Sequence, residues 1–249
     1  MLTFIIPLKS AKVSKNWRKT CALFERCLKA TCNQTSDAFR TVVVCNEKPD
    51  IDFQHDAVSY VMVDFLPPEK ERLRINGLRT DKGRRILKGM TFAQQFSPTH
   101  VMAVDADDCV SNRLAAFVSQ HPNANGWYLK SGWKYREDGA QLYKKFQRFY
   151  TMSGTANIIS AKHLSLPDPP EYNRGYGYYK FFIDHQKVRR VMGERGASLS
   201  PLPFPGAVYI LATGDNISRN ENNLSFNFLS QRKLSDNIRT EFSLDPLKL

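Results

Sequence analysis

The chain has 249 residues, 42% of them hydrophobic, which is typical of one ordinary globular domain with a sizeable core rather than of a disordered chain. Lysine and arginine number 36 against 24 acidic residues, and the net charge of +12 favours an anionic partner such as a nucleotide, a nucleic acid or an acidic membrane surface. No apolar run approaches the length needed to span a bilayer, so a membrane-spanning protein is not expected.

The first residues and the cysteines indicate the compartment. The segment Met1–Pro7 has no basic leader and only a very short apolar run, so it is not expected to be a signal peptide. The cysteines are odd in number and show no paired spacing of zinc ligands: Cys21, Cys27, Cys32, Cys45 and Cys109. Reduced thiols fit a cytoplasmic protein, and peripheral contact with the inner face of a membrane remains open.

Strand and helix patterns alternate in the first half of the chain. In chain order, strands are predicted at Thr3–Pro7, Thr41–Cys45, Val58–Val63 and Val101–Val104, and amphipathic helices around Trp17–Leu28 and Ile86–Ala93. This β-α-β alternation predicts a doubly wound α/β layer with right-handed crossovers.

The second half, after about His121, is richer in glycine, aromatic and basic residues. The pattern predicts a hairpin turn at Arg136–Gly139, strands at Gly154–Ser160 and Ala207–Leu211, and one helical stripe through Phe181, His185, Val188 and Met192. Composition shows no sharp break, so we predict a single domain over 1–219, with a nucleotide-binding half at 1–120 and an acceptor half at 121–219. Residues 220–249 are expected to form a tail that docks on the body or on a membrane surface.

Three carboxylates follow the strand at Val101–Val104: Asp105, Asp107 and Asp108. Carboxylates at such short spacing repel one another, and burying them unpaired is costly, but a divalent cation removes both problems. Hard oxygen ligands suit Mg²⁺ or Mn²⁺, and the carboxyl ends of strands are where open α/β sheets bind ligands. The alternative is an acidic turn between strand and helix, with Asp108 or Ser111 capping the helix.

These pieces together resemble the GT-A glycosyltransferases, especially the family-2-like inverting group. The matching segments are Phe4–Pro7, Thr41–Cys45, Asp81–Arg85, Val104–Asp108 and Tyr209–Ser218. The resemblance implies an α/β fold with a doubly wound, mostly parallel sheet flanked by helices and a smaller acceptor-side half. It also implies transfer of a sugar from a UDP- or GDP-linked donor to a hydroxyl of a glycan, a lipid-linked or a protein acceptor, with inversion.

The resemblance assigns the metal site. Asp105 and Asp107 match the Asp-x-Asp motif, in which Asp105 faces the ribose or sugar and Asp107 the Mn²⁺ or Mg²⁺ ion. Asp108 is an extra carboxylate that shares either role, and Asp215 is a further ligand. Related enzymes often have histidine where Thr213 stands, so this chain departs from the pattern at one metal ligand.

The resemblance also assigns the residues that bind the nucleotide sugar: Pro7, Leu8, Lys9, Asn46, Arg84, Arg85, Asp105 and Asn216. Such enzymes often carry an acidic residue near the nucleobase, directly after the second strand. Asn46 and Glu47 stand at this position, so the match is inexact. An arginine fork suits a base edge or a phosphate. Solvated surface cations are the alternative for Lys9, Arg84 and Arg85.

An inverting transfer needs a carboxylate that takes the proton of the acceptor hydroxyl. Asp184 is the candidate, with Glu171 and Asp215 as rivals, and a helix-terminal acid interacting with the dipole is the alternative. His185 is expected to be a satisfied core histidine. Aromatic residues form an acceptor cleft or belong to the core: Trp127, Tyr128, Trp133, Tyr135, Tyr172, Tyr176, Tyr178 and Tyr179.

Two other functions compete with the glycosyltransferase. A nucleotidyltransferase uses the same strand-end carboxylates, but it usually has a glycine-rich loop after the first strand, and Pro7–Ser10 has no glycine. A non-catalytic nucleic-acid-binding protein fits the charge, yet the acidic cluster would repel phosphate without a metal, so no nucleic-acid partner is expected.

Overall fold

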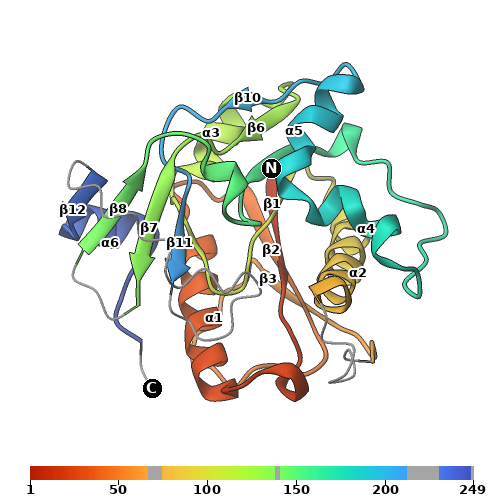
Figure 1. Ribbon diagram of the computed structural model, residues 1–249, viewed down its shortest axis with the longest axis horizontal. Helices are drawn as coiled ribbons and strands as arrows, with labels where there is room; N and C mark the ends of the chain where they lie inside the picture. The colour runs from red at the N-terminus through yellow and green to blue at the C-terminus, as the bar shows by residue number, and fades with distance from the viewer. Residues whose placement is uncertain (67–74, 138–140, 212–229, 248–249) are drawn as a thin grey trace.

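The computed structural model of the protein describes residues 1–66, 75–137, 141–211 and 230–247. It contains a larger sheet with helices on both faces and a smaller sheet to one side (Figure 1). Short 3₁₀ helices connect several elements: η1 (Ala11–Val13), η3 (Gln94–Phe96), η4 (Phe149–Thr151) and η5 (Ala161–His163).

The larger sheet has seven strands in the order β10-β6-β9-β4-β1-β2-β3. They are β1 (Leu2–Pro7), β2 (Phe39–Cys45), β3 (Val58–Met62), β4 (His100–Ala103), β6 (Gly126–Tyr128), β9 (Asn157–Ser160) and β10 (Ser200–Pro201). β1 pairs in parallel with both β2 and β4, whereas β9 pairs antiparallel with β4 and β6. The strand order therefore reverses direction at β1 and β4, which is where doubly wound sheets bind ligands.

Alternate residues of β1 serve opposite faces of this sheet. Phe4 and Ile6 belong to the main core with α1 (Trp17–Cys32) and α3 (Leu114–Gln120), while Ile5 packs with α2 (Ile75–Ala93). The strands are buried on both faces and therefore read as continuous apolar runs.

The smaller sheet has five strands in the order β12-β8-β7-β11-β5. They are β5 (Cys109–Val110), β7 (Gly132–Arg136), β8 (Gln141–Lys145), β11 (Ala207–Leu211) and β12 (Gln231–Lys233). α6 (Asp236–Phe242) lies next to it in Figure 1, and Phe242 and Leu244 are buried in the main core. The sequence pattern predicts the β7–β8 hairpin but not that these strands leave the larger sheet.

Two helices occupy the region where the sequence predicts one helical stripe from Phe181 to Met192. α4 (Tyr176–Ile183) ends and α5 (His185–Glu194) begins at Asp184, whose φ of −78° and ψ of 64° are not helical. α4 packs on α2, and Gly83 of α2 permits this, because a Cβ there would lie 2.5 Å from Ile183 Cδ1 and Tyr179 Cβ. Asp184 is thereby held at a chain corner rather than along a helix.

The predicted α/β class with a mostly parallel sheet flanked by helices is confirmed. Within the described ranges, no helix combines the length and apolar character that crossing a membrane requires.

Candidate functional site

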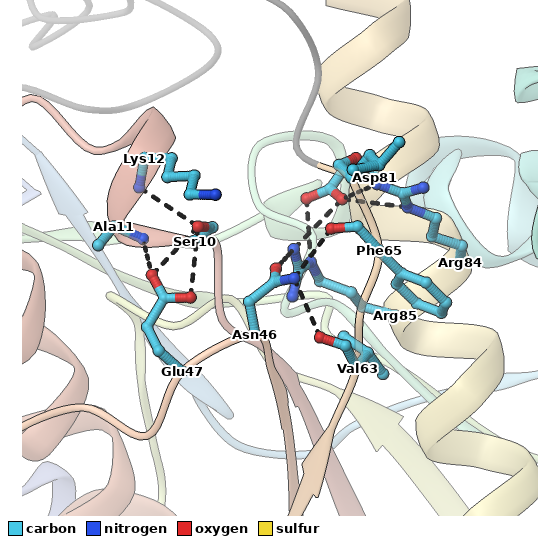
Figure 2. Close-up of polar contacts among 11 residues, drawn as sticks. Ser10, Ala11, Lys12, Asn46, Glu47, Val63, Phe65, Asp81, Arg84 and Arg85 are labelled. Atoms are coloured by element: carbon cyan, nitrogen blue, oxygen red, sulfur yellow. Dashed lines mark hydrogen bonds and ion pairs between the residues drawn. The ribbon is translucent and has the colours of Figure 1, made fainter.

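An open cleft of about 650 Å³ lies at the carboxyl ends of β1, β2 and β3. Its lining comes from three segments that are far apart in sequence: Ser10 and Lys12 after β1, Asn46 and Glu47 after β2, and Met62, Val63, Asp64, Phe65 and Leu66 at and after the end of β3. The strand order places these segments side by side, as Figure 2 shows for most of them.

Glu47 closes one side of the cleft. Its carboxylate accepts hydrogen bonds from Ser10 Oγ at 3.1 Å and from the backbone N–H of Ala11 (Figure 2). These bonds fix the turn that leads into η1, so the acidic group after β2 holds the chain after β1.

Asn46 and Arg85, both predicted to bind the donor, hold the opposite wall. Asn46 Nδ2 donates to the carbonyls of Val63 at 3.0 Å and Phe65 at 2.8 Å, and its Oδ1 accepts from Arg85 Nη2 at 2.5 Å. Arg85 is only 1% exposed and also donates from Nε to Asp81 at 2.9 Å. The structure thus places Asn46 in the cleft lining and the buried Arg85 behind it, and together the two side chains set the course of residues 63–65.

Arg84 lies at the edge of the same wall. Its guanidinium sits 4.7 Å from the ring centroid of Phe65 and donates to the carbonyl of Leu66 and to Asp81. Stacking and hydrogen bonds thus fix the orientation of this guanidinium.

The strand-end carboxylates begin with Asp105, which forms an ion pair with Lys82 of α2. Its backbone N–H donates to Thr155 Oγ1 at 2.9 Å. Gly154 lies against the pair, because a Cβ there would be 2.5 Å from Lys82 Nζ and 2.8 Å from both carboxylate oxygens of Asp105. A glycine is therefore required for this close approach.

Asp107 is half-buried, and desolvation together with the charge of Asp105 raises its pKa to about 6, against the opposing influence of Lys9. Of the predicted residues after β1, Lys9 is thus close enough to act on Asp107. Pro7 is the last residue of β1, and Leu8 is buried and donates its N–H to the Val44 carbonyl at 3.0 Å.

Asp108 faces the interior. It is fully buried, accepts from Ser153 Oγ at 2.5 Å and from the Ile210 N–H at 3.3 Å, and burial raises its pKa well above the ordinary value. Its carboxylate ties the strand end to β11 and to the segment before β9.

No three His, Cys, Asp or Glu side chains in the described part of the chain are arranged to hold a metal ion. A magnesium-like ion, however, is commonly bound through one or two carboxylates together with substrate phosphates. Asp105 and Asp107 suit that mode. Asp108 does not, because its oxygens accept hydrogen bonds from Ser153 and Ile210 in the interior. Asp215, Asn216 and Thr213 lie outside the described residues.

Asp184 sits between α4 and α5. It accepts a hydrogen bond from Tyr176 Oη and lies 3.3 Å from Lys187 Nζ. Burial alone would raise the pKa of Asp184, but these hydrogen bonds and the charges of Lys187 and Arg79 hold it below its usual value. The rival Glu171 is 57% exposed and lies 3.7 Å from Arg174.

His185 differs from the expectation of a satisfied core histidine. Its Nε2 is buried and has no hydrogen-bond partner among the described residues. Desolvation and the charge of Lys82 lower the pKa of His185, so the imidazole is held neutral near the Lys82–Asp105 pair.

The segment 151–157 joins these parts, and sequence reasoning missed its role. Ser153 binds Asp108, Thr155 binds the backbone of Asp105, and Asn157 Nδ2 donates to the His185 carbonyl at 3.1 Å. Its only sequence signal is Gly154 at the start of a predicted strand. Lys82 was likewise missed, because a lysine beside Arg84 and Arg85 reads as one of several surface cations.

The aromatic residues divide between core and surface. Trp127, Trp133, Tyr135 and Tyr179 are buried, which supports the core alternative for these four. Tyr128, Tyr172, Tyr176 and Tyr178 are half-buried.

Comparison with known proteins identifies the fold. No family model and no curated protein matches the sequence. Solved structures of residues 1–349 of S. aureus TarS do match: the complex with UDP at a TM-score of 0.51 and 13% identity, covering 86% of this chain and 61% of that one. The complex with UDP-GlcNAc matches at a TM-score of 0.51 and 14% identity, covering 88% and 60%.

This chain therefore spans about three-fifths of the TarS chain in those structures. At such low identity the likeness shows a shared fold, and it does not transfer activity.

Proposed function

We propose that the protein is a glycosyltransferase that binds a nucleotide-sugar donor at the carboxyl ends of β1 to β4 and transfers the sugar to an acceptor hydroxyl. One observation carries this proposal: the sheet brings the cleft, the carboxylates of Asp105 and Asp107 and the ammonium groups of Lys9 and Lys82 to one edge. The fold is shared with TarS, whose structures contain UDP and UDP-GlcNAc, which supports a nucleotide-sugar ligand.

The nucleoside part of the donor occupies the cleft. Phe65 and the backbone of residues 63–66 form one wall, and Arg84 offers its guanidinium at the edge. Asn46 lines the cleft where the nucleoside would meet it, and Arg85, buried behind Asn46, positions that wall. Asn216 remains a proposed donor ligand.

The diphosphate lies toward Lys9 and Lys82. Asp105 and Asp107 would hold Mg²⁺ or Mn²⁺, and the cation would offset the negative charge that develops on the departing nucleoside diphosphate. The ion pair holds the ammonium group of Lys82 beside Asp105. This ammonium would therefore bind the phosphate oxygens of a donor that lies next to the carboxylate.

The acceptor hydroxyl loses its proton to Asp184, and the transfer inverts the anomeric configuration. The lowered pKa keeps this carboxylate ionised, and Tyr176 and Lys187 fix its orientation. Proton removal by a positioned carboxylate strengthens the attacking oxygen.

The donor is identified by titrating a panel of UDP- and GDP-sugars, with and without Mn²⁺, while binding heat and melting temperature are measured. We expect tight binding of one nucleotide series, strengthened by Mn²⁺, and weak binding of the free sugars. An oligonucleotide in moderate salt is the control. Tighter binding of the oligonucleotide than of every sugar nucleotide would contradict the proposal.

The base is tested with Asp184→Asn, which keeps the shape but removes the proton acceptor. Turnover should fall by about two to four orders of magnitude, the range for losing general-base catalysis, with nucleotide affinity nearly unchanged. Glu171→Gln is the matched control and should keep wild-type turnover. Near-normal turnover in Asp184→Asn, or a product with retained configuration, would rule Asp184 out.

A further inference from the structure

Arg189 of α5 lies on two tyrosine rings. Its guanidinium is 5.1 Å from the ring centroid of Tyr128 and 5.1 Å from that of Tyr150, and the two rings meet edge to face with centroids 5.2 Å apart. Arg189 is exposed and both tyrosines are half-buried. These three side chains, the Tyr128–Tyr150–Arg189 cluster, present two aromatic surfaces and an oriented cation to solvent.

The cluster adjoins the proposed catalytic centre. Tyr150 lies in η4, whose last residue Thr151 accepts a hydrogen bond from Gln186 Nε2 at 2.9 Å at the start of α5. Arg189 follows Asp184 by five residues, about 7.5 Å along a helix axis. The cluster therefore lies within roughly one and a half turns of α5 from the proposed base.

The surrounding surface is positively charged. Residues 174–195 contain six cations, Arg174, Lys180, Lys187, Arg189, Arg190 and Arg195, against two acids, Asp184 and Glu194. Lys180, Arg189 and Arg195 have no carboxylate partner in the described part of the chain. Their charge is not neutralised locally, so the surface attracts an anion.

We propose that the Tyr128–Tyr150–Arg189 cluster is an acceptor subsite for a sugar unit that carries a phosphate or a carboxylate, an inference that rests on the proposed function. Tyrosine faces pack against the apolar face of a sugar ring, and the planar guanidinium can donate two parallel hydrogen bonds to an oxyanion. Stacking on the rings orients Arg189 before the ligand arrives, which lowers the entropic cost of binding.

An anionic membrane is the other ligand that such charge would attract. A helix that lies in a membrane interface needs an exposed apolar face. Val188 and Met192 of α5 are buried against Ile159 and Leu199 in the protein, and the remaining apolar residue, Val191, is half-buried. The observations therefore favour an acidic saccharide.

The test measures affinity calorimetrically in moderate salt for a galacturonic acid hexamer, a neutral galactose hexamer and a phosphorylated mannose oligomer. The wild-type protein should bind at least one acidic oligomer about tenfold more tightly than the neutral hexamer, and the stronger arm identifies carboxylate or phosphate. Arg189→Gln should weaken the binding of that acidic oligomer about tenfold, the scale of a charged hydrogen bond. Arg190→Gln is the matched control, because Arg190 is the next residue and pairs with Glu194 at 2.6 Å, and it should change affinity less than twofold.

Equal binding of neutral and acidic oligomers, equal losses in the two variants, or no binding of any oligomer would overturn the subsite. Binding of phosphatidylglycerol vesicles without binding of acidic oligomers would assign the surface to a membrane instead. A parallel titration with UDP and Mn²⁺ separates the two proposals. Failure there contradicts the donor site, whereas loss of acidic-oligomer discrimination with intact UDP binding contradicts only the subsite.

Discussion

Asp107 and Asp108 are neighbours in the chain whose carboxylates lie in different surroundings. Asp107 is half-buried beside the charges of Asp105 and Lys9, whereas Asp108 is fully buried and bonded to Ser153 and the backbone of Ile210. Asp107 belongs to the turn between β4 and β5, which the Asp108 N–H closes on the Asp105 carbonyl at 3.0 Å, whereas Asp108 leads directly into the buried strand β5.

Alanine substitutions should separate these two roles. Asp107→Ala should abolish cation-dependent nucleotide binding and leave the melting temperature unchanged. Asp108→Ala should lower the free energy of unfolding by about 1–3 kcal/mol, because it leaves buried donors without an acceptor. Calorimetric titration and urea unfolding measure the two quantities, and equal stability of both variants would contradict the assignment of Asp108.

Gly154 provides a second test at single-residue resolution. In Gly154→Ala the new Cβ would displace the Lys82–Asp105 pair, whose side-chain ends can move without unfolding the protein. We expect near-normal stability but about tenfold weaker donor binding, the scale of one charged hydrogen bond. Gly175→Ala is the control, since a Cβ at Gly175 meets nothing within 4 Å. Wild-type donor affinity in Gly154→Ala would show that the pair is not part of the site.

At the scale of elements, the packing of α4 on α2 decides where Asp184 lies. Gly83 lets the helices approach, and Leu87 continues the contact with Tyr179 and Ile183. The corner at Asp184 therefore depends on α2, which also carries Lys82 and Arg84 of the proposed donor site. One helix thus aligns the two parts of the proposed site.

Gly83→Ala should disturb this alignment. Overpacking typically costs about 1–3 kcal/mol, which outweighs the gain of up to about 1 kcal/mol from replacing glycine in a helix. Turnover should fall as well, because α4 and Asp184 must shift. Gly193→Ala in α5 is the matched control, where the nearest atom to the new Cβ is Ser198 Oγ at 3.7 Å, and it should be neutral or stabilising. Urea unfolding and turnover report the result, and unchanged stability in Gly83→Ala would show that the helices can separate freely.

At the scale of the whole molecule, the larger sheet joins the two predicted halves through β4 and β9. His100 of β4 is fully buried, with Nε2 2.9 Å from the Ala124 carbonyl and Nδ1 3.1 Å from Thr99 Oγ1. Desolvation lowers the pKa of His100, so the folded protein holds the neutral ring between strands from both halves.

Acidification should therefore destabilise the fold through His100. Below pH 6.5, the ordinary value for histidine, the unfolded chain binds a proton that the folded protein excludes, so the free energy of unfolding falls with pH down to the folded pKa. Between pH 7.5 and 5.5, the melting temperature of His100→Gln should fall by less than that of the wild-type protein. His55→Gln, at an exposed position, controls for the loss of an imidazole. An equal loss in wild type and His100→Gln would exclude this contribution.

The sequence by itself determined the strands and helices of the first half and the carboxylate cluster after β4. Buried parallel strands are continuous apolar runs and the helices keep their 3.6-residue period, so local patterns suffice there. The sequence also indicated Asp184 as a candidate base, without its partners.

Only the tertiary structure decided which side chains meet. It turned Asp108 inward, placed Arg85 behind Asn46 of the cleft wall, and brought Lys82 onto Asp105 across 23 residues. It also broke the predicted stripe at Asp184 and moved β7, β8 and β11 into a second sheet. Such outcomes depend on long-range packing and on hydrogen bonds between distant segments, which a periodic pattern in one segment does not contain.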